Sequence, residues 1–138
     1  MAARETDGYT TRVQDYSNSL ISVIDDDRCV LEATANLLRS SGFRVECFSS
    51  AEEFLRGPHP KLAGCLILDI RMPGMSGLEL RDHLAAAGLP IPTIFCSAHG
   101  NRTLREQVMR EGAVELLVKP YDDEALLRAI HSAFARDA

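Results

Sequence analysis

Six polar residues stand out because each one comes directly after, or at the end of, an apolar run. They are Asp25, Asp26, Asp27, Asp69, Ser97 and Lys119. Carboxylates that share a small space repel one another and raise one another's pKa, so a purely structural site usually avoids such a cluster. A site for a divalent cation requires one. If the fold brings these residues together, their chemistry points to a cation-binding site.

Each of these residues, taken singly, also has a structural interpretation. One of residues 25–27 is expected to cap the helix that follows, since acidic side chains favour a helix N-terminus. Asp69 and Ser97 could be ordinary residues at strand-to-loop junctions, and Lys119 could be a surface cation that pairs with Asp69. The structural interpretation weakens only if several of these groups converge.

The elements that carry these residues alternate between strand and helix. Five short runs are typical of strands: 20–24, 43–48, 64–70, 91–97 and 113–119. Five segments carry helical patterns: 27–42, 50–57, 77–88, 101–112 and 122–135. This alternation predicts an α/β fold, with a five-stranded parallel sheet and helices on both faces. The flavodoxin-like strand order 2-1-3-4-5 suits it.

Local patterns refine these elements. The first helix is expected to bury four apolar positions, Val30, Ala33, Leu37 and Leu38. Two serine-glutamate pairs have the spacing of a capping box, Ser50 with Glu53 and Ser76 with Glu79. The nearly continuous apolar run at 64–70 predicts a central strand that is buried on both faces, whereas the alternation at 43–48 predicts an edge strand.

Length and composition indicate one soluble domain. The 138 residues are 46% hydrophobic and 25% charged, which is ordinary for a globular protein. Residues 1–18 lack a periodic apolar pattern, so we expect a flexible N-terminal tail there and one domain at 19–138. The net charge of −5 does not favour nucleic-acid binding by this chain. No apolar run approaches the ~20 residues that span a bilayer, and a signal-peptide core is lacking, so we expect a cytoplasmic location.

The four cysteines, Cys29, Cys47, Cys65 and Cys96, form no C-x-x-C pair, and three of them lie in apolar runs. This pattern favours reduced core residues over metal ligands or disulfides.

The predicted sheet brings the polar residues to one edge. In such a sheet the working crevice lies beyond the carboxyl ends of the strands. Asp25–Asp27 end the first strand, and Asp69 ends the third, which is its neighbour in the predicted order. Ser97 and Lys119 end the fourth and fifth strands. We therefore expect the acids, the hydroxyl and the ammonium group to converge.

Four motifs resemble the receiver domain of bacterial response regulators, of the CheY-like superfamily. In chain order they are VIDDD, LILDIRMPGMSGLEL, IFCSAHG and LVKPYDDEALLRAI. The stretches DIRMPGMSGLEL and FCSAHG are similar to the FixJ/NarL-type branch. The resemblance covers residues 19–134. It implies a two-component signalling switch that accepts a phosphoryl group, and not an enzyme.

The resemblance implies a role for each acid. Asp69 matches the phosphoacceptor, and Asp25 and Asp26 match the acidic pair that helps to bind Mg²⁺. Arg71 matches the position whose backbone carbonyl completes the metal site. The chemistry is consistent, since phosphoryl transfer depends on positioning and charge neutralisation, and Mg²⁺ prefers oxygen ligands. The Pro73-Gly74 bend and Gly77 would together let the backbone turn sharply after Asp69 and leave room above its carboxylate for a donor.

The resemblance also implies which residues near Lys119 stabilise the phosphoryl group and which respond to the phosphorylated state. Ser97 and Lys119 match the hydroxyl and the lysine that stabilise the phosphoryl group, and we expect the bond to Pro120 to be cis. The family often carries, three positions before the lysine, an aromatic residue that changes exposure on activation. Leu116 stands there, so readout would fall to a smaller apolar side chain. Tyr121 lies on the wrong side of the lysine to replace it.

Partners and output follow from the same resemblance. The donor would be a sensor histidine kinase or a phosphotransfer protein. Phosphorylation would draw Ser97 and the loop SAHGN toward Asp69 and repack the surface formed by the helix of residues 101–111, the fifth strand and the last helix. That surface carries charges of both signs, which suits a weak phosphorylation-dependent homodimer. Transcriptional control through a further domain and action as a stand-alone regulator both remain open.

Two other functions would use similar residues. A phosphohydrolase of the haloacid-dehalogenase type resembles D-x-D at its nucleophile, whereas residues 69–71 read D-I-R and lack the second acid. A binding module that had lost phosphorylation would not be expected to keep Asp26, Asp69, Ser97 and Lys119 intact.

Overall fold

The computed structural model describes residues 19–137, and its strands form one parallel sheet in the order β2-β1-β3-β4-β5. The strands are β1 (Leu20–Ile24), β2 (Arg44–Phe48), β3 (Ala63–Asp69), β4 (Thr93–Ser97) and β5 (Glu115–Val118). The predicted fold class and strand order are confirmed. The tail expected at residues 1–18 lies outside the described residues.

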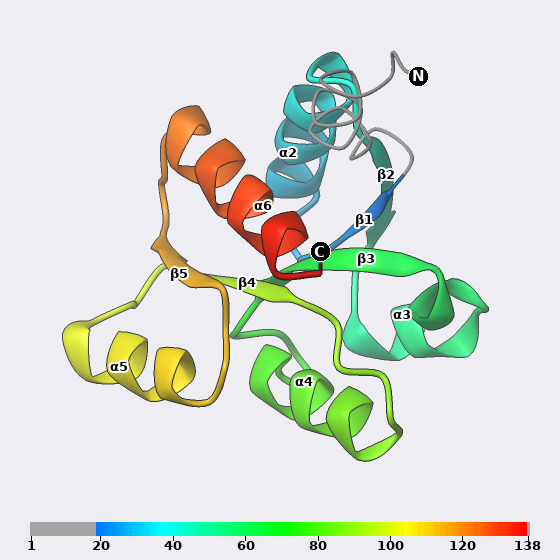
Figure 1. The fold of residues 1–138 in the computed structure, drawn as a ribbon, viewed down its shortest axis with the longest axis vertical. Helices are drawn as coiled ribbons and strands as arrows, with labels where there is room; N and C mark the ends of the chain where they lie inside the picture. The colour runs from blue at the N-terminus through cyan, green and yellow to red at the C-terminus, as the bar shows by residue number, and fades with distance from the viewer. Residues whose placement is uncertain (1–18, 138) are drawn as a thin grey trace, which may run out of the picture.

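Helices cover both faces of the sheet. α2 (Arg28–Ser40) and α6 (Asp123–Asp137) lie on one face, and α3 (Ala51–Arg56), α4 (Gly77–Ala86) and α5 (Arg102–Arg110) lie on the other (Figure 1). Alternate residues of a strand point to opposite faces. Cys65 and Ile67 of β3 accordingly join the core under α2 and α6, whereas Leu66 and Leu68 join the other core. β3 is therefore the central strand, buried on both faces as predicted.

The helix starts agree with the predicted caps in part. Ser76 and Glu79 form a complete capping box at α4. At α3, the Ser50 hydroxyl accepts the Glu53 N–H, but the Glu53 carboxylate accepts hydrogen bonds from Ser49 instead of Ser50. The predicted second half of this box is wrong because Ser49 offers two donors, its backbone N–H and its hydroxyl.

The buried face of α2 differs from the prediction. α2 buries Leu31, Thr34, Ala35 and Leu38. Besides Leu38, the prediction was correct in part for Leu37, which is half-buried and packs against the core, and wrong for Val30 and Ala33, which are half-buried and exposed and lie outside the core clusters. The face that α2 turns toward the sheet is shifted by one residue from the predicted face. The side chains of Val30, Ala33 and Leu37 therefore face the start of α6.

Two further features differ from the sequence analysis. All four cysteines are free, but Cys29 is exposed and Cys47 is only half-buried, so the core interpretation is wrong for Cys29. It lies in the first turn of α2, beyond the edge of the sheet. A short 3-10 helix at His59–Lys61 was not predicted. Within residues 19–137, no helix combines the length and apolar character needed to cross a membrane.

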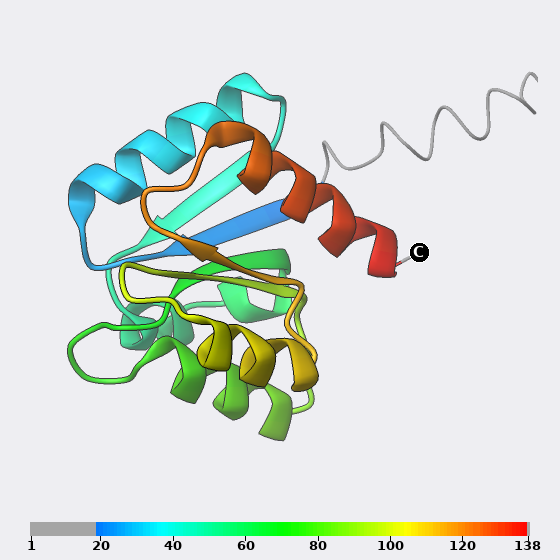
Figure 2. The same cartoon turned by 90° about the vertical axis from the view of Figure 1, so that its left-hand side faces the viewer.

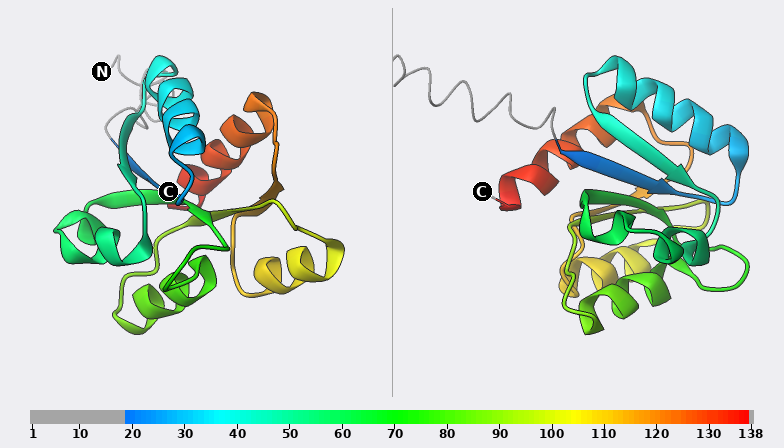
Figure 3. Two further views of the ribbon diagram at one scale, coloured as in Figure 1. Left: turned by 180° about the vertical axis from the view of Figure 1, so that it is seen from behind. Right: turned by 90° about the vertical axis from the view of Figure 1, so that its right-hand side faces the viewer.

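The carboxyl ends of the strands all point to the same edge of the sheet. Figures 2 and 3 show this edge from two sides, with the loop between β3 and α4 projecting beyond it. The loops from β1 to α2 and from β5 to α6 lie at the same edge. The polar residues singled out in the sequence lie at the starts of these loops or, for Asp69 and Ser97, at the ends of β3 and β4.

Candidate functional site

Three acids lie together where β1 and β3 end. The two strands are neighbours, with Ile24 of β1 paired to Leu68 of β3, so the residues that follow them are adjacent. Asp25 and Asp69 are only 3% and 6% exposed, whereas Asp26 is exposed. One carboxylate oxygen from each of the three acids lies within 4.8 Å of the others. Asp27 is instead the N-cap of α2.

Lys119 supplies the positive charge of this cluster. Its Nζ lies 2.7 Å from Oδ2 of Asp25 and 3.6 Å from Oδ2 of Asp69. The other oxygen of Asp25 accepts a hydrogen bond of 2.9 Å from the backbone N–H of Asp27. Both oxygens of Asp25 therefore have partners already. The Lys119–Pro120 peptide bond is cis.

The charges of the site are not balanced. Burial, and then the neighbouring charge of Asp25, raise the pKa of Asp69 from 3.8 to about 6, against the opposing effects of Lys119 and the N–H of Arg71. Burial alone would lower the pKa of Lys119, but its hydrogen bond to Asp25 and its attraction to both acids raise it above 10.5. The cluster therefore holds three carboxylates and one ammonium group, which pairs with Asp25 and Asp69.

The donor atoms of the cluster fit Mg²⁺. This ion prefers oxygen ligands, keeps several waters and is held by one or two carboxylates in many proteins. Asp26 and Asp69 can each offer an oxygen, whereas Asp25 is better placed to orient a bound water. The backbone N–H of Arg71 donates to Asp69, so the Arg71 backbone already lies at the site. A divalent cation would also relieve the repulsion that raises the pKa of Asp69.

Ser97 lies at the same edge but is bonded to its own loop. Its side chain is buried, and its hydroxyl accepts a hydrogen bond of 3.0 Å from the backbone N–H of His99. Its carbonyl accepts the backbone N–H of Lys119 at 2.9 Å. The structure therefore places Ser97 next to the lysine, with its hydroxyl held by the loop and not by the acids.

Leu116 is buried in the core beneath α5, where Phe95 and Val108 also lie. A Cβ added to Gly100 would meet the Val118 side chain at 2.8 Å, so the loop after β4 lies tightly on β5. These contacts place the predicted readout position under the loop that leads from Ser97.

Tyr121 lies on the other face of the sheet. Its hydroxyl is 3.4 Å from the Thr34 hydroxyl of α2 and also hydrogen-bonds the Cys96 thiol, and burial raises the pKa of the phenol. Tyr121 therefore does not replace an aromatic residue at the Leu116 position.

The loop after Asp69 is shaped by two glycines and one residue that the sequence analysis did not single out. Gly74 has a positive φ of 77°, and a Cβ on Gly77 would lie only 2.3 Å from the Asp69 carbonyl oxygen. Gly77 is therefore required by backbone packing and not by space for a donor. Oε2 of Glu52, in α3, accepts the backbone N–H of Met75 at 2.9 Å. No motif marks Glu52, because an acid in the first turn of a helix is ordinary.

Comparison with known protein families shows to which family this fold belongs. The profile of the response regulator receiver domain matches residues 21–131. The chain belongs to this family. The response regulator TmoT of Ectopseudomonas mendocina is 48% identical over 115 residues, which are 83% of this chain and 52% of TmoT. The transcriptional regulatory protein FixJ of Azorhizobium caulinodans is 42% identical over 118 residues, which are 86% of this chain and 56% of FixJ.

Solved structures agree with this assignment. The response regulator StyR is 45% identical and has a TM-score of 0.79, with 86% of this chain and 60% of that chain covered. The structure of FixJ-N is 34% identical and has a TM-score of 0.76, with 85% and 94% covered. This receiver domain spans about half the length of the curated relatives it matches.

An apolar groove of about 510 Å³ lies beside the acidic site of the receiver domain. Val30, Ala33 and Leu37 of α2 form one side, and Pro120 and Leu126 belong to the opposite side. Lys119 also lines this groove, so the groove opens next to the acids. The three α2 residues are those that the sequence analysis had assigned to the core.

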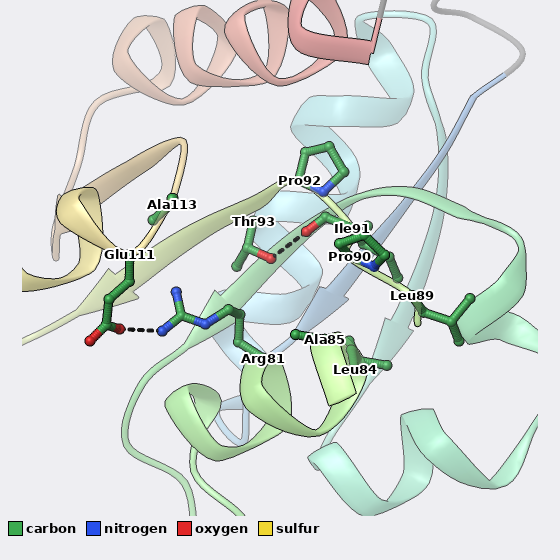
Figure 4. A pocket seen from close by; sticks show the side chains of 11 residues that line it. Arg81, Leu84, Ala85, Leu89, Pro90, Ile91, Pro92, Thr93, Glu111 and Ala113 are labelled. Carbon is green, nitrogen blue, oxygen red and sulfur yellow. Dashed lines mark hydrogen bonds and ion pairs between the residues drawn. The ribbon is translucent and has the colours of Figure 1, made fainter. Parts of the chain in front are cut away.

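A second pocket, of about 300 Å³, lies at the opposite end of the sheet, where β4 begins. Arg81 of α4 crosses it toward Glu111, with which it forms an ion pair (Figure 4). The guanidinium carbon lies 5.3 Å from the centre of the Phe95 ring. Nη1 of Arg81 is buried without a hydrogen-bond partner among the described residues, and the nearby aromatic ring offers it a π face instead.

Proposed function

We propose that this receiver domain accepts a phosphoryl group on Asp69 in a Mg²⁺-dependent reaction. The observation that supports the proposal is the imbalance of charge around Asp69, which is buried beside two other acids and one shared lysine. Such an arrangement destabilises the site by itself and favours the arrival of positive charge. A structural role for the acids would not require it.

The proposed reaction is a displacement at phosphorus. A carboxylate oxygen of Asp69 attacks the phosphorus atom, and the bond from phosphorus to the donor atom breaks, with its electron pair leaving on the donor. Asp26, Asp69 and the Arg71 carbonyl would hold Mg²⁺, and the bound ion would supply positive charge for the phosphoryl oxygens. Lys119 would neutralise a further oxygen, and Asp25 would keep Lys119 in place.

A histidine kinase or phosphotransfer protein is the proposed donor. A protein that delivers a phosphohistidine to Asp69 must cover the edge of the site. The apolar groove between α2 and α6 supports this, because it ends at Lys119 and offers Val30, Ala33 and Leu37 to an amphipathic helix of the donor. We also propose that this domain does not itself bind DNA, because the net charge is −5, and that it acts in the cytoplasm.

The proposed switch starts at Ser97. A phosphoryl group on Asp69 offers strong acceptor oxygens. The Ser97 hydroxyl would therefore give up its hydrogen bond from the His99 N–H and donate a hydrogen bond to a phosphoryl oxygen. The loop at 98–100 would then shift on β5, and Leu116 and α5 would adjust to it. The affected surface is formed by α5, β5 and α6.

This surface is the proposed site of partner binding or weak homodimerisation. Several of its charges are already paired within the domain, including Arg102 with Glu106, Arg105 with Glu115, and Arg128 with Glu124. Glu111 is paired with Arg81 of α4 and is not free to pair across a dimer. Intermolecular ion pairs would therefore have to replace existing ones, which makes the dimer weaker than the charge pattern alone suggests.

Transcriptional control through a further domain is the proposed output. It is supported by FixJ, a relative named as a transcriptional regulator, of which this chain covers 56%.

Sedimentation velocity with and without beryllofluoride tests self-association. An unchanged monomer would leave a different protein as the target of the switched surface.

Intact-mass measurement after incubation with acetyl phosphate and Mg²⁺ tests the proposed function. The wild type should gain one phosphoryl group, and Asp69→Asn should gain none, because an amide is a poor nucleophile. A wild type that gains nothing would contradict the proposal. Release of inorganic phosphate without accumulation of the adduct would favour the phosphohydrolase alternative, against which the absence of a second acid at Arg71 already counts.

A further inference from the structure

Glu52 lies outside every motif of the site, yet it contacts the loop that follows Asp69. Its Oε2 accepts a hydrogen bond of 2.9 Å from the backbone N–H of Met75, which lies 23 positions further along the chain. Hydrogen bonds from Met75 and from its own backbone lower the pKa of the Glu52 carboxyl. Glu52 is therefore a charged acceptor at neutral pH, and it joins the first turn of α3 to this loop.

The loop that Glu52 contacts supplies backbone groups to the site. It starts at Ile70, whose N–H donates to the Cys96 carbonyl at 3.0 Å, and it closes where the Gly77 N–H returns to the Ile70 carbonyl at 2.9 Å. Arg71 lies between these two hydrogen bonds, and its N–H donates to Asp69. A displacement of the loop between them would therefore move the Arg71 backbone.

Two consecutive amides fix the far end of the loop. The Met75 N–H donates to Glu52 of α3, and the Ser76 N–H donates to Glu79 of α4 at 2.8 Å. The two carboxylates belong to different helices, so the loop is held from outside as well as by the helix that it enters. A Cβ at Gly74 would lie 2.7 Å from Glu52 Oε2, so the carboxylate lies directly against the loop backbone.

We propose that Glu52 is a positioning residue for the metal site, because its hydrogen bond to Met75 holds the loop in which the Arg71 backbone lies. The inference rests on the proposed function. A loop released from Glu52 would have more conformations to lose when a cation binds, so Mg²⁺ affinity would fall. Chemistry at saturating Mg²⁺ would be preserved, because Asp69 and Lys119 do not contact Glu52.

Calorimetric titration of the unphosphorylated chain with Mg²⁺ tests this, in the wild type and four variants. Glu52→Ala should weaken Mg²⁺ binding about tenfold, as for other residues that support metal ligands. Glu52→Gln should stay close to the wild type, since its amide oxygen can still accept the Met75 N–H. Glu52→Asp keeps the charge but shortens the reach, so it should resemble Glu52→Ala.

Glu53→Ala is the matched control. Glu53 is the next residue in the first turn of α3, and its carboxylate accepts hydrogen bonds from Ser49 instead of the loop. The two alanine variants therefore change the net charge alike at adjacent positions of one helical turn, and only one of them cuts the contact with Met75. Glu53→Ala should bind Mg²⁺ like the wild type.

The rate of phosphoryl uptake from acetyl phosphate at increasing Mg²⁺ gives a second readout. Glu52→Ala should need more Mg²⁺ and then reach the wild-type rate. The inference is overturned if the two alanine variants bind Mg²⁺ equally, or if Glu52→Asp binds like the wild type while Glu52→Gln binds weakly, which would indicate a charge effect. A wild type that binds Mg²⁺ but takes up no phosphoryl group would contradict the proposed function and leave the titration to decide this inference.

Discussion

Buried charge is compensated at one end of the sheet and left uncompensated at the other. At the amino end, Arg81 is mostly buried, pairs with the exposed acids Glu111 and Asp82, and lies over the Phe95 ring, so the buried charge is a cation that meets solvent-exposed anions and an aromatic face. At the carboxyl end, Asp25 and Asp69 share Lys119, and the third acid, Asp26, lies beside them. The amino end is complete without any added ion, whereas the carboxyl end keeps an excess of negative charge. An unbalanced buried charge therefore distinguishes a site that receives something from a site that only stabilises the fold.

The largest test of this contrast compares Lys119→Met with Arg81→Met. Removal of Lys119 leaves buried acids without a counter-charge and should lower the free energy of unfolding by about 3 kcal/mol at neutral pH. Mg²⁺ should restore part of that loss, because a cation replaces the missing charge. Arg81→Met should also destabilise, through lost packing, but Mg²⁺ should restore none of it. Chemical denaturation with and without Mg²⁺ measures both, and equal restoration would contradict the contrast.

The next test uses the dependence of the free energy of unfolding on pH that the titration of Asp69 produces in metal-free buffer. Because its pKa is raised from 3.8 to about 6, the folded state holds the proton more tightly than the unfolded state. The contribution of this proton to the stability of the folded state is therefore fully present below about pH 3.8 and is lost as the pH rises through about 6. Asp69→Asn removes this dependence, so it should be more stable than the wild type by roughly 1–2 kcal/mol at neutral pH, after allowance for solvent screening.

Denaturant unfolding across this pH range checks the sign. The advantage of Asp69→Asn should vanish near pH 4 and grow up to about pH 7. A variant that is less stable than the wild type at neutral pH would show that the carboxylate is stabilised and not strained by its surroundings.

A smaller effect is expected for Asp26, the exposed acid of the cluster. Asp26→Asn should leave the stability of the metal-free protein nearly unchanged and weaken Mg²⁺ binding by about tenfold, since an oxygen ligand is lost. The shift of the melting temperature with Mg²⁺ concentration measures this. Asp27→Asn is the control, because Asp27 caps α2 and an asparagine caps equally well. A loss of Mg²⁺ affinity in the control alone would contradict the assignment.

The smallest expected effect concerns the groove beside the site. Ala33→Glu adds a charge on an exposed position of α2 that lines the groove. Uptake from acetyl phosphate should be unchanged, whereas transfer from a histidine kinase that phosphorylates the wild type should slow by about threefold to tenfold. Ala87→Glu, at an exposed position after α4, is the control. Equal rates for both variants with the kinase would contradict docking in the groove.

The alternation of strands and helices predicted a parallel sheet, and the flavodoxin-like strand order that suits such a sheet then predicted that the acids converge at one edge. The sequence did not predict which face of α2 is buried. Val30, Ala33 and Leu37 have helical spacing, but so do Leu31 and Leu38, and only the packing against the sheet decides between two overlapping stripes. Periodicity shows that a face is apolar and cannot show whether another part of the same chain covers it.

Contacts between distant segments were also beyond the sequence. The Glu52–Met75 hydrogen bond spans 23 positions and uses a backbone N–H, which leaves no trace in side-chain identity. The half of the capping box that Glu53 does not form has a local cause, because Ser49, four residues away, competes with the expected donor. The resemblance to receiver domains supplied the residue roles at the site, whereas the structure supplied the partners of each residue.

The contact of Gly77 with the backbone of Asp69 affects how sequence variation at this position should be interpreted. A Cβ there would lie 2.3 Å from the Asp69 carbonyl oxygen, a contact with the main chain that no choice of rotamer relieves. In a library of variants selected only for abundance in cells, Gly77 should tolerate no substitution, even when the library is built on Asp69→Asn and cannot signal. A glycine retained beside a phosphoacceptor would then report on folding, and its retention could not be taken as a sign of phosphorylation.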